Sequence, residues 1–181
     1  MEMGSTPHIR LAARRELDDI GALVRDAFAP FRLALPPHIF ERYVAEASDL
    51  SRTWPDATIA VIDSSGRIAG TVTYYDDAAR EGMGWPSGPA GLRTLAVSPS
   101  AQGRGYGRLL CDWCVARARR QRAEGIALHT AAFMTSACTL YESMGFERRP
   151  SHDLLASDVL GFDPATGDQE IMAYLLPLMR A

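Results

Sequence analysis

The stretch LRTLAVSPSAQGRGYGRLL, residues 92–110, links a strand-like segment to a helix through a turn rich in glycine and arginine. Residues 92–97 have strand character, and an apolar helical run starts at Gly105. Gly103, Gly105 and Gly107 let the backbone approach a ligand closely, and a helix N-terminus offers unpaired N–H groups to a phosphate. On these residues alone the turn is either a phosphate-binding site or a tight connection with solvated arginines.

Arg104 and Arg108 add positive charge beside the glycines. Two common phosphate motifs do not fit this turn. The dinucleotide fingerprint G-x-G-x-x-G would place its third glycine on Arg108, counted from Gly103, or on Leu110, counted from Gly105. The Gly-Lys-Ser/Thr of a P-loop is absent from the sequence. The glycines, the helix N-terminus and the two arginines can therefore still bind a phosphate, although neither motif is present.

Outward from this stretch, hydrophobic periodicity predicts a mixed α/β fold. Strands are expected at residues 8–14, 57–63, 67–75, 92–97, 126–132, 146–150 and 169–178, and helices at 15–28, 38–50, 105–123 and 135–144. Residues 76–91 are expected to be a loop without regular structure, and 151–168 a polar loop. Residues 1–181 are predicted to form one domain with a loose tail at 1–7.

Composition excludes several classes of protein. The chain has 181 residues, 47% of them hydrophobic, and a net charge of -3, which argues against a nucleic-acid partner. No apolar run approaches the roughly 20 residues of a membrane helix, and the N-terminus lacks the apolar core of a signal peptide. Three cysteines do not make a disulfide framework. These features predict a cytoplasmic protein without a membrane partner.

Two segments together resemble the GNAT superfamily of N-acetyltransferases. In that family a strand is followed by a short loop and then by Q/R-x-x-G-x-G/A at the start of a helix, which Gln102, Gly105 and Gly107 match. The later segment SACTLYESMGF, residues 136–146, is similar to the family motif A-x-x-x-Y-E-x-x-G-F. The resemblance implies a mostly antiparallel, twisted central sheet flanked by helices and splayed at an acetyl-CoA site.

The same resemblance implies which residues bind acetyl-CoA. The turn would hold the pyrophosphate, and backbone groups of the splayed strand would hold the pantetheine arm and the thioester carbonyl. The residues implied are Leu95, Ala96, Val97, Gln102, Gly103, Arg104, Gly105, Tyr106, Gly107 and Arg108. The alternative for Leu95 to Val97 is an ordinary buried strand.

Tyr141 is the residue that the resemblance implies as general acid. A phenol with a pKa of about 10 is protonated at neutral pH and can protonate a leaving thiolate. The alternative is a packed tyrosine with its hydroxyl at the surface.

The general base is left open. Many relatives carry a Glu on the strand before the glycines, but residues 92–94 hold no carboxylate. His129 has a suitable pKa, although a lone strand histidine is more often structural. Asp76, Asp77 and Glu81 could act through water, with a solvated loop as the alternative. The family also often has an Asn touching CoA where Met134 stands.

Three other patterns have structural interpretations. Cys111 and Cys114 form a C-x-x-C inside a helix, where packing is favoured over redox or metal chemistry, and no metal site is expected. The basic run RARRQR, residues 117–122, suits a helix C-terminus. Four aromatic residues lie where the family builds part of its acceptor pocket, although most are expected to be core residues: Phe31, Phe40, Tyr43 and Trp54.

The resemblance thus predicts transfer of an acetyl group from acetyl-CoA, a cosubstrate, to a primary amine of a small molecule, by direct attack through a tetrahedral intermediate. A protein N-terminus or lysine is the alternative acceptor. A CoA-binding sensor or scaffold without catalysis is the alternative from another class, since the strand carboxylate is missing. The resemblance to this family also makes a homodimer possible.

Overall fold

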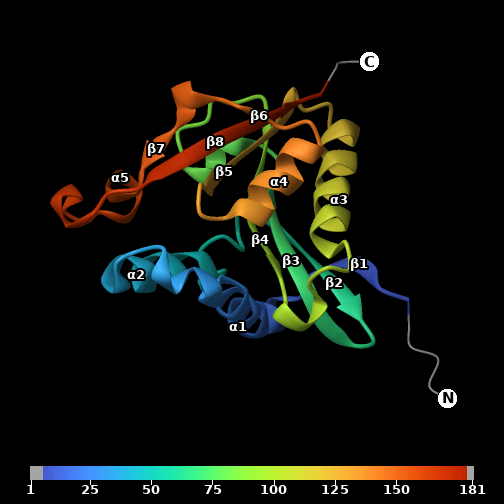
Figure 1. Ribbon diagram of the computed structural model, residues 1–181. Coiled ribbons are helices and arrows are strands. Elements are labelled where there is room, and N and C mark those ends of the chain that lie inside the picture. The colour runs from blue at the N-terminus through green and yellow to red at the C-terminus, as the bar shows by residue number, and fades with distance from the viewer. Residues whose placement is uncertain (1–5, 179–181) are drawn as a thin grey trace.

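The computed structural model describes residues 6–178, and within them an eight-stranded sheet has the order β1-β2-β3-β4-β5-β8-β6, with β7 paired to β8 (Figure 1). The strands are β1 (His8–Leu11), β2 (Thr58–Ser64), β3 (Arg67–Tyr75), β4 (Ala90–Val97), β5 (Gly125–Ala131), β6 (Glu147–Arg148), β7 (Leu154–Leu155) and β8 (Glu170–Pro177). The helices are α1 (Leu17–Phe28), α2 (Pro37–Ser48), α3 (Tyr106–Arg120), α4 (Thr135–Ser143) and α5 (Ala156–Leu160).

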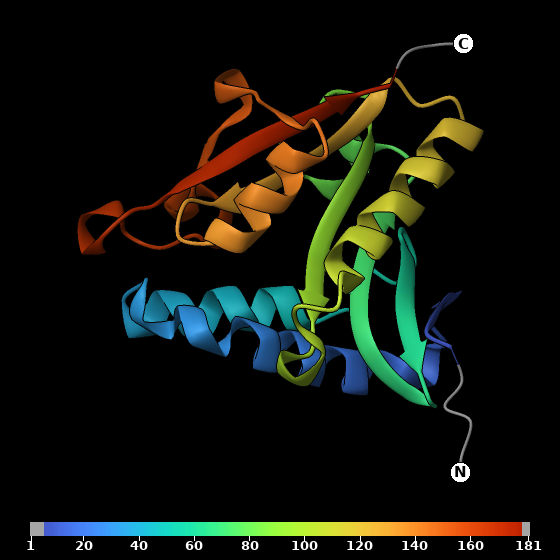
Figure 2. The ribbon, with the colours of Figure 1, turned by 45° about the vertical axis from the view of Figure 1, so that its right-hand side comes forward.

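The sheet changes character between β4 and β5. These two strands are parallel, and the other pairs among the described strands are antiparallel. Their pairing covers only Ala90 with Ile126 and Gly91 with Ala127. Beyond these pairs the strands diverge, as Figure 2 shows. The splayed, mostly antiparallel sheet confirms the predicted fold class.

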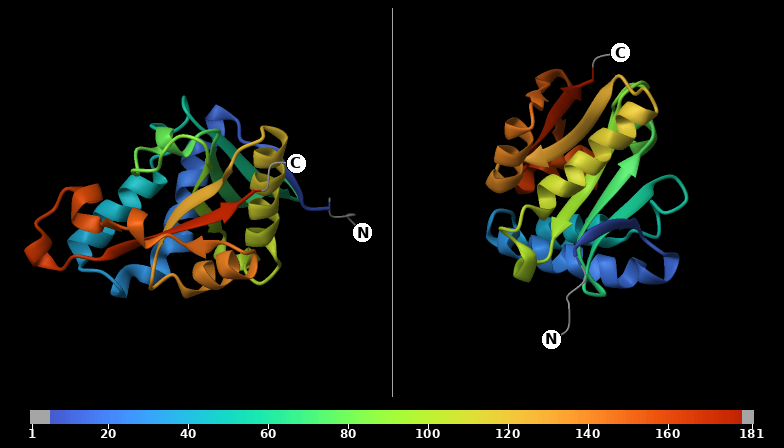
Figure 3. Two further views of the ribbon diagram at one scale, coloured as in Figure 1. Left: turned by 90° about the horizontal axis from the view of Figure 1, so that it is seen from above. Right: turned by 90° about the vertical axis from the view of Figure 1, so that its right-hand side faces the viewer.

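Both faces of the first half of the sheet are covered by helices, and β2 shows why. Its successive side chains point to opposite faces. Ile59 and Val61 pack in the cluster that includes Ile20 of α1, whereas Ala60 and Ile62 pack in the cluster that includes Leu110 of α3. The strand is therefore apolar on both faces from Ile59 to Ile62, and α1 and α3 lie on opposite faces (Figure 3).

The predicted order of elements is confirmed up to β6, and two loop predictions are wrong. Residues 76–91 hold a 3-10 turn, Ala78–Glu81, and the first residues of β4, with Trp85 only 5% exposed. Residues 151–168 hold β7, α5 and two further 3-10 turns. Residues 1–5 of the expected tail lie outside the described part of the chain. Among the described helices, none has the length and apolar composition that a membrane span requires.

Candidate active site

A cavity of about 780 Å³ lies where β4 and β5 diverge. Its walls come from β4, the start of α3, α4, and the first two helices, with α5 and the start of β8 at one end. Each wall belongs to a different part of the chain, so the cavity depends on the whole fold. A bounded space of this size suits a small-molecule ligand.

The glycine turn, residues 100–107, forms one end of this cavity. Gly103 has φ of 76° and Gly105 has φ of 77°, in the left-handed region where glycine is favoured. A Cβ atom built on either glycine meets nothing within 4 Å, so the turn faces open space. Gly105 is the N-cap of the 15-residue helix α3 and supplies no side-chain cap. The first N–H groups of α3 therefore remain available to an anion.

The structure brings most of the predicted binding residues together. The cavity is lined by Leu95, Ala96, Val97, Gln102, Gly103, Gly105, Tyr106, Gly107 and Arg108. Arg104 is exposed and is not part of this lining. Arg108 is also exposed, and its guanidinium lies 4.0 Å from Asp112 and 3.4 Å from the hydroxyl of Ser143.

A β-bulge in β4 faces the same cavity. Thr71 of β3 pairs with Ala96 and Thr73 pairs with Arg93, so two β4 residues oppose one residue of β3. The first of the two, Thr94, has φ of 51°, which is strained for a β-branched residue. Such strain is concentrated at functional sites. The sequence gives no sign of it, because nothing in a threonine predicts a positive φ.

Tyr141, on α4, lines the cavity with 5% of its surface exposed. Burial raises the pKa of its phenol well above the ordinary value, so the hydroxyl keeps its proton at neutral pH. Its ring packs 5.5 Å from that of Phe146. The position thus offers a proton donor held in place by its neighbours.

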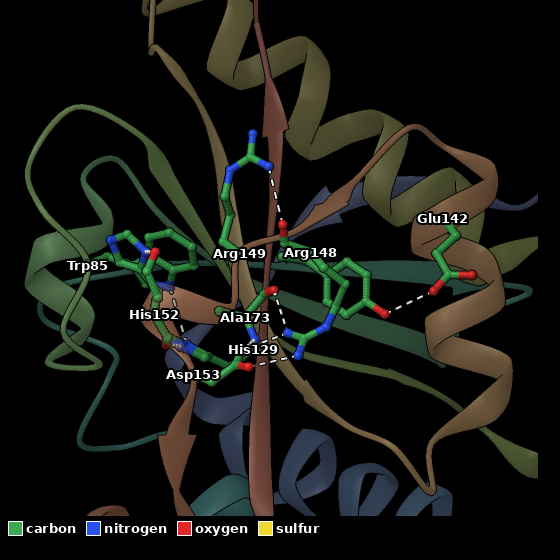
Figure 4. A network of polar contacts seen from close by, with 10 residues as sticks. Trp85, His129, Glu142, Arg148, Arg149, His152, Asp153 and Ala173 are labelled. Carbon is green, nitrogen blue, oxygen red and sulfur yellow. Dashed lines mark hydrogen bonds and ion pairs between the residues drawn. The ribbon is translucent and has the colours of Figure 1, made fainter.

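His129, on β5, is held by hydrogen bonds on both ring nitrogens. The indole N–H of Trp85 donates to Nδ1 at 3.2 Å, and Nε2 lies 2.9 Å from the carbonyl oxygen of His152 (Figure 4). An indole can only donate, so Nδ1 carries no proton and Nε2–H donates to the carbonyl. Burial lowers the pKa of the ring, and the hydrogen bond to His152 opposes this shift. His129 also lines the cavity, but with Nδ1 accepting from Trp85 and Nε2–H donating to a carbonyl, neither ring nitrogen is free to take a proton in this arrangement.

The hydrogen-bond network of Figure 4 continues into α4. Arg148 donates to both carboxylate oxygens of Asp153, at 2.6 and 2.7 Å, and to the carbonyl of Ala173 at 2.9 Å. Its guanidinium lies 5.3 Å from the ring centroid of Tyr174, whose hydroxyl donates to Glu142 at 2.9 Å. Glu142 of the second motif therefore ties α4 to β8, next to Tyr141.

Glu81 contradicts the expectation of a solvated loop. Its side chain is only 2% exposed, and it lines the cavity. One carboxylate oxygen, Oε1, lies 3.9 Å from Nε of Arg93, while Oε2 is buried with no hydrogen-bond partner among the described residues. Burial raises the pKa of the carboxyl to about 7, and the charge of Arg93 opposes this shift. The sequence could not reveal this burial, since Glu81 is enclosed by residues of other elements.

The two neighbouring carboxylates have different surroundings. Asp77 accepts hydrogen bonds from the hydroxyl of Ser87 and from the backbone N–H of Ala79, and the Ser87 bond lowers its pKa most. Asp76 is exposed and pairs with Arg117 at 3.3 Å. Neither lines the cavity.

The aromatic residues predicted for the acceptor pocket divide into two pairs. Phe31 and Tyr43 line the cavity, and Tyr43 stacks on Phe28 at 5.6 Å. Phe40 packs in the cluster that joins α2 to α5, and Trp54 packs in the cluster beneath α1. Met134, at the N-cap of α4, also lines the cavity.

The remaining motifs are structural. Cys111 and Cys114 are fully buried free thiols, and burial raises the pKa of Cys111 to about 12. Arg117 of the basic run turns inward, with its guanidinium 5.3 Å from the ring centroid of Tyr74. Across residues 6–178, no group of three or more His, Cys, Asp or Glu side chains could hold a metal ion.

Comparisons with known proteins agree with this geometry. A family model described as Acetyltransferase (GNAT) family matches residues 22–146, which is more than half of the chain. The mouse protein "Probable N-acetyltransferase family 8 member 5" (Mus musculus) is 31% identical over 121 residues. That match covers 60% of this chain and 50% of the relative, so the chain spans half of the relative's length.

Solved structures show the same fold at low sequence identity. A GNAT family acetyltransferase from Brucella melitensis in complex with acetyl-CoA has a TM-score of 0.57 and 22% identity, covering 78% of this chain and 83% of that one. The ribosomal-protein-S18-alanine N-acetyltransferase from Escherichia coli has a TM-score of 0.67 and 17% identity, covering 97% and 96%.

Proposed function

The chain belongs to the GNAT family of acetyltransferases, and on that premise we propose that it transfers the acetyl group of acetyl-CoA to the primary amine of a small molecule. The observation that supports this most directly is the divergence of β4 and β5 after two residue pairs, with a cavity lying in the opening. One end of the cavity presents a phosphate-binding turn, and the interior holds a buried phenol and a buried carboxylate.

The residues present fit acetyl-CoA. The open space above Gly103 and Gly105, together with the uncapped N-terminus of α3, accommodates a pyrophosphate. Arg104 and Arg108, both exposed, supply charge near that position. Along β4, the edge beyond Gly91 is not paired to β5 within the described residues, so its backbone groups can bind the pantetheine arm.

The acyl transfer then needs three contributions from this chain. Backbone N–H groups of Leu95, in the bulge, and of Ala96, next to it, would stabilise the oxyanion that forms when the amine attacks the thioester carbonyl. Tyr141 would give its proton to the departing thiolate. A base must take a proton from the amine, and Glu81 is the buried carboxylate that lines the cavity. This carboxylate favours an enzyme over a sensor that has lost catalysis.

One end of the cavity has an apolar wall. Leu35 and Ile39 at the start of α2 pack with Leu160 of α5, and all three residues line the cavity. An apolar wall at this end supports a small amine with an aliphatic or aromatic body as the acceptor.

A screen of amines tests the proposal. The protein is incubated with acetyl-CoA and a panel of phenylalkylamines, aliphatic amines, amino acids and short peptides, and acetylated products are identified by mass spectrometry. We expect acetylation of small amines with an apolar body and slower reaction with peptides. Preferential acetylation of peptide N-termini would replace the small-molecule acceptor with a protein, the acceptor that the name of the Escherichia coli neighbour specifies. Binding of acetyl-CoA without any product would contradict the enzymatic function.

A further inference from the structure

Glu81 lies between two cavities of different character. It lines the main cavity and also a polar crevice of about 210 Å³ on the other side. Both spaces share Glu46, Ala47, Glu81, Arg93 and Thr94 as walls. The crevice also has charged groups along its walls: Glu46, Asp49, Arg52, Asp56 and Arg80. The carboxylate therefore separates a largely apolar reaction space from a charged space that water can occupy.

The unpartnered oxygen of Glu81 lies over the point at which the sheet opens. A Cβ atom built on Gly91 would be 3.5 Å from Oε2 of Glu81. Gly91 belongs to the last residue pair that joins β4 to β5. The same Cβ would crowd Tyr75 Cβ at 3.2 Å and Ala78 Cα at 3.3 Å, so the glycine lets the 3-10 turn that carries Glu81 pack closely on β4. A carboxylate thus reaches the strand although β4 has none beyond Gly91.

We propose that Glu81 is the general base of the acetyl transfer and that the polar crevice carries the proton from Glu81 to solvent. This role rests on the proposed function. The structural argument is the combination of burial, an oxygen that has no hydrogen-bond partner among residues 6–178, and a side chain that lines two spaces at once. A solvated surface carboxylate would have none of these properties.

Each acetyl transfer moves two protons from the acceptor nitrogen. The ammonium nitrogen of the acceptor loses two protons, forms the C–N bond with its electron pair, and the C–S pair leaves with the CoA sulfur. One proton goes to the carboxylate of Glu81 and then to water in the crevice. Tyr141 protonates the sulfur, and the second proton from nitrogen restores the phenol. The products are the amide, the free thiol of CoA and one proton released to solvent.

The charged groups around Glu81 set the pH at which it can act. Arg93 of β4 favours the carboxylate, whereas burial disfavours it. Tyr75 of β3 and Glu46 of α2 line the same crevice, as does Arg80 from the turn itself. Burial raises the pKa of Tyr75, so this phenol is neutral beside Glu81 at neutral pH. Glu81 therefore changes charge near neutrality, where a base is most effective.

The decisive experiment compares the pH profile of kcat/KM in wild type and Glu81→Gln, with an amine that the screen identifies. In wild type the rate should rise to a plateau above about pH 7, because ionised Glu81 accepts the proton of the ammonium. In the variant kcat should fall by about 10²–10⁴-fold, and the residual rate should keep rising with pH because only the neutral amine reacts. Glu41→Gln, an exposed carboxylate on α2, is the matched control and should behave as wild type.

An arylamine acceptor gives a second, independent measurement. Arylamines are already neutral at neutral pH, so the defect of Glu81→Gln should be smaller with them than with a phenylalkylamine. If Glu81→Gln does not fold, Glu81→Asp should keep the plateau at a reduced rate. A variant without the carboxylate that retains the wild-type rate and plateau would overturn the base assignment, while the amine screen would still support the function. A wild type without activity on any amine overturns both.

A separate variant tests whether the crevice carries the proton from Glu81 to solvent. Thr53 lines the crevice but not the main cavity. Thr53→Phe should narrow the crevice and lower kcat several-fold, with the dissociation constant of acetyl-CoA unchanged. An unchanged kcat in the folded variant would overturn the crevice as the proton route.

Discussion

Two regions border the same cavity and contribute to it by different means. The glycine turn, residues 100–107, faces open space and offers main-chain N–H groups, and Gln102 and Arg104 are exposed. The segment 76–91 contributes buried side chains instead: Glu81 lines the cavity, and Trp85 supports β5 through His129. The first region depends on backbone conformation, and the second depends on which groups the fold removes from water. Substitutions should therefore affect the two regions in different ways.

The largest effect should come from the buried carboxylate of the segment 76–91. In the folded protein the pKa of Glu81 is raised from 4.5 to about 7. Between these values the folded state holds a proton that the unfolded state has released, so stability falls as pH rises through this range and is constant above it. The difference predicts a loss of roughly 3 kcal/mol of unfolding free energy. Urea denaturation from pH 4.5 to 8 measures it.

Glu81→Gln should remove this pH dependence. The variant should match wild type near pH 4.5 and be more stable above pH 7, because it buries no charge. Identical pH dependence in both proteins would show that Glu81 is not buried in solution, and the difference between the two regions would disappear.

A loss of nearly the same size is expected at the glycine turn. Acetyl-CoA at about 100 times its dissociation constant should stabilise the wild type by roughly 2.7 kcal/mol. Gly105→Val should remove most of this stabilisation, because a branched side chain would occupy the open space that the phosphates need. Thermal denaturation with and without acetyl-CoA measures the effect.

Gly82→Val is the matched control for Gly105→Val. Gly82 has φ of 75° and also faces open space, but it lies in the segment 76–91 and does not line the cavity. Both variants should lose similar stability without ligand, since both place a side chain at positive φ. Only Gly105→Val should lose the response to acetyl-CoA. Equal responses in the two variants would refute the assignment of the turn to phosphate binding.

The turn and Tyr141 were predictable because their signals are local. The glycines and the tyrosine motif occupy short stretches whose spacing is visible in the sequence. The burial of Glu81 was not predictable, because it depends on neighbours outside its turn, among them Arg93, whose Nε lies 3.9 Å from Oε1. The helix α5 and the strand β7 have only five and two residues, too few for hydrophobic periodicity to reveal.

Tyr141→Phe tests the residue that the second sequence motif identifies as the general acid. The change keeps the packed ring and removes the acidic proton, so acetyl-CoA binding should persist. The value of kcat should fall by about 10²-fold, the lower end for general acid catalysis, because thiolate is a fair leaving group. Tyr174→Phe also removes a hydroxyl, but one that bonds Glu142 outside the cavity, and it should leave kcat unchanged. A loss traced wholly to weaker acetyl-CoA binding would make Tyr141 a binding residue.

The smallest effect should come from Trp85→Phe. This change removes the hydrogen bond to His129 Nδ1 but keeps most of the apolar surface that stacks on His152 at 4.5 Å. The lost bond and the small cavity should together cost about 1–2 kcal/mol of unfolding free energy. Because Glu81 and not His129 is the proposed base, kcat and its pH profile should stay unchanged. A shifted pH profile would instead identify His129 as the titrating base and transfer the catalytic role from Glu81 to β5.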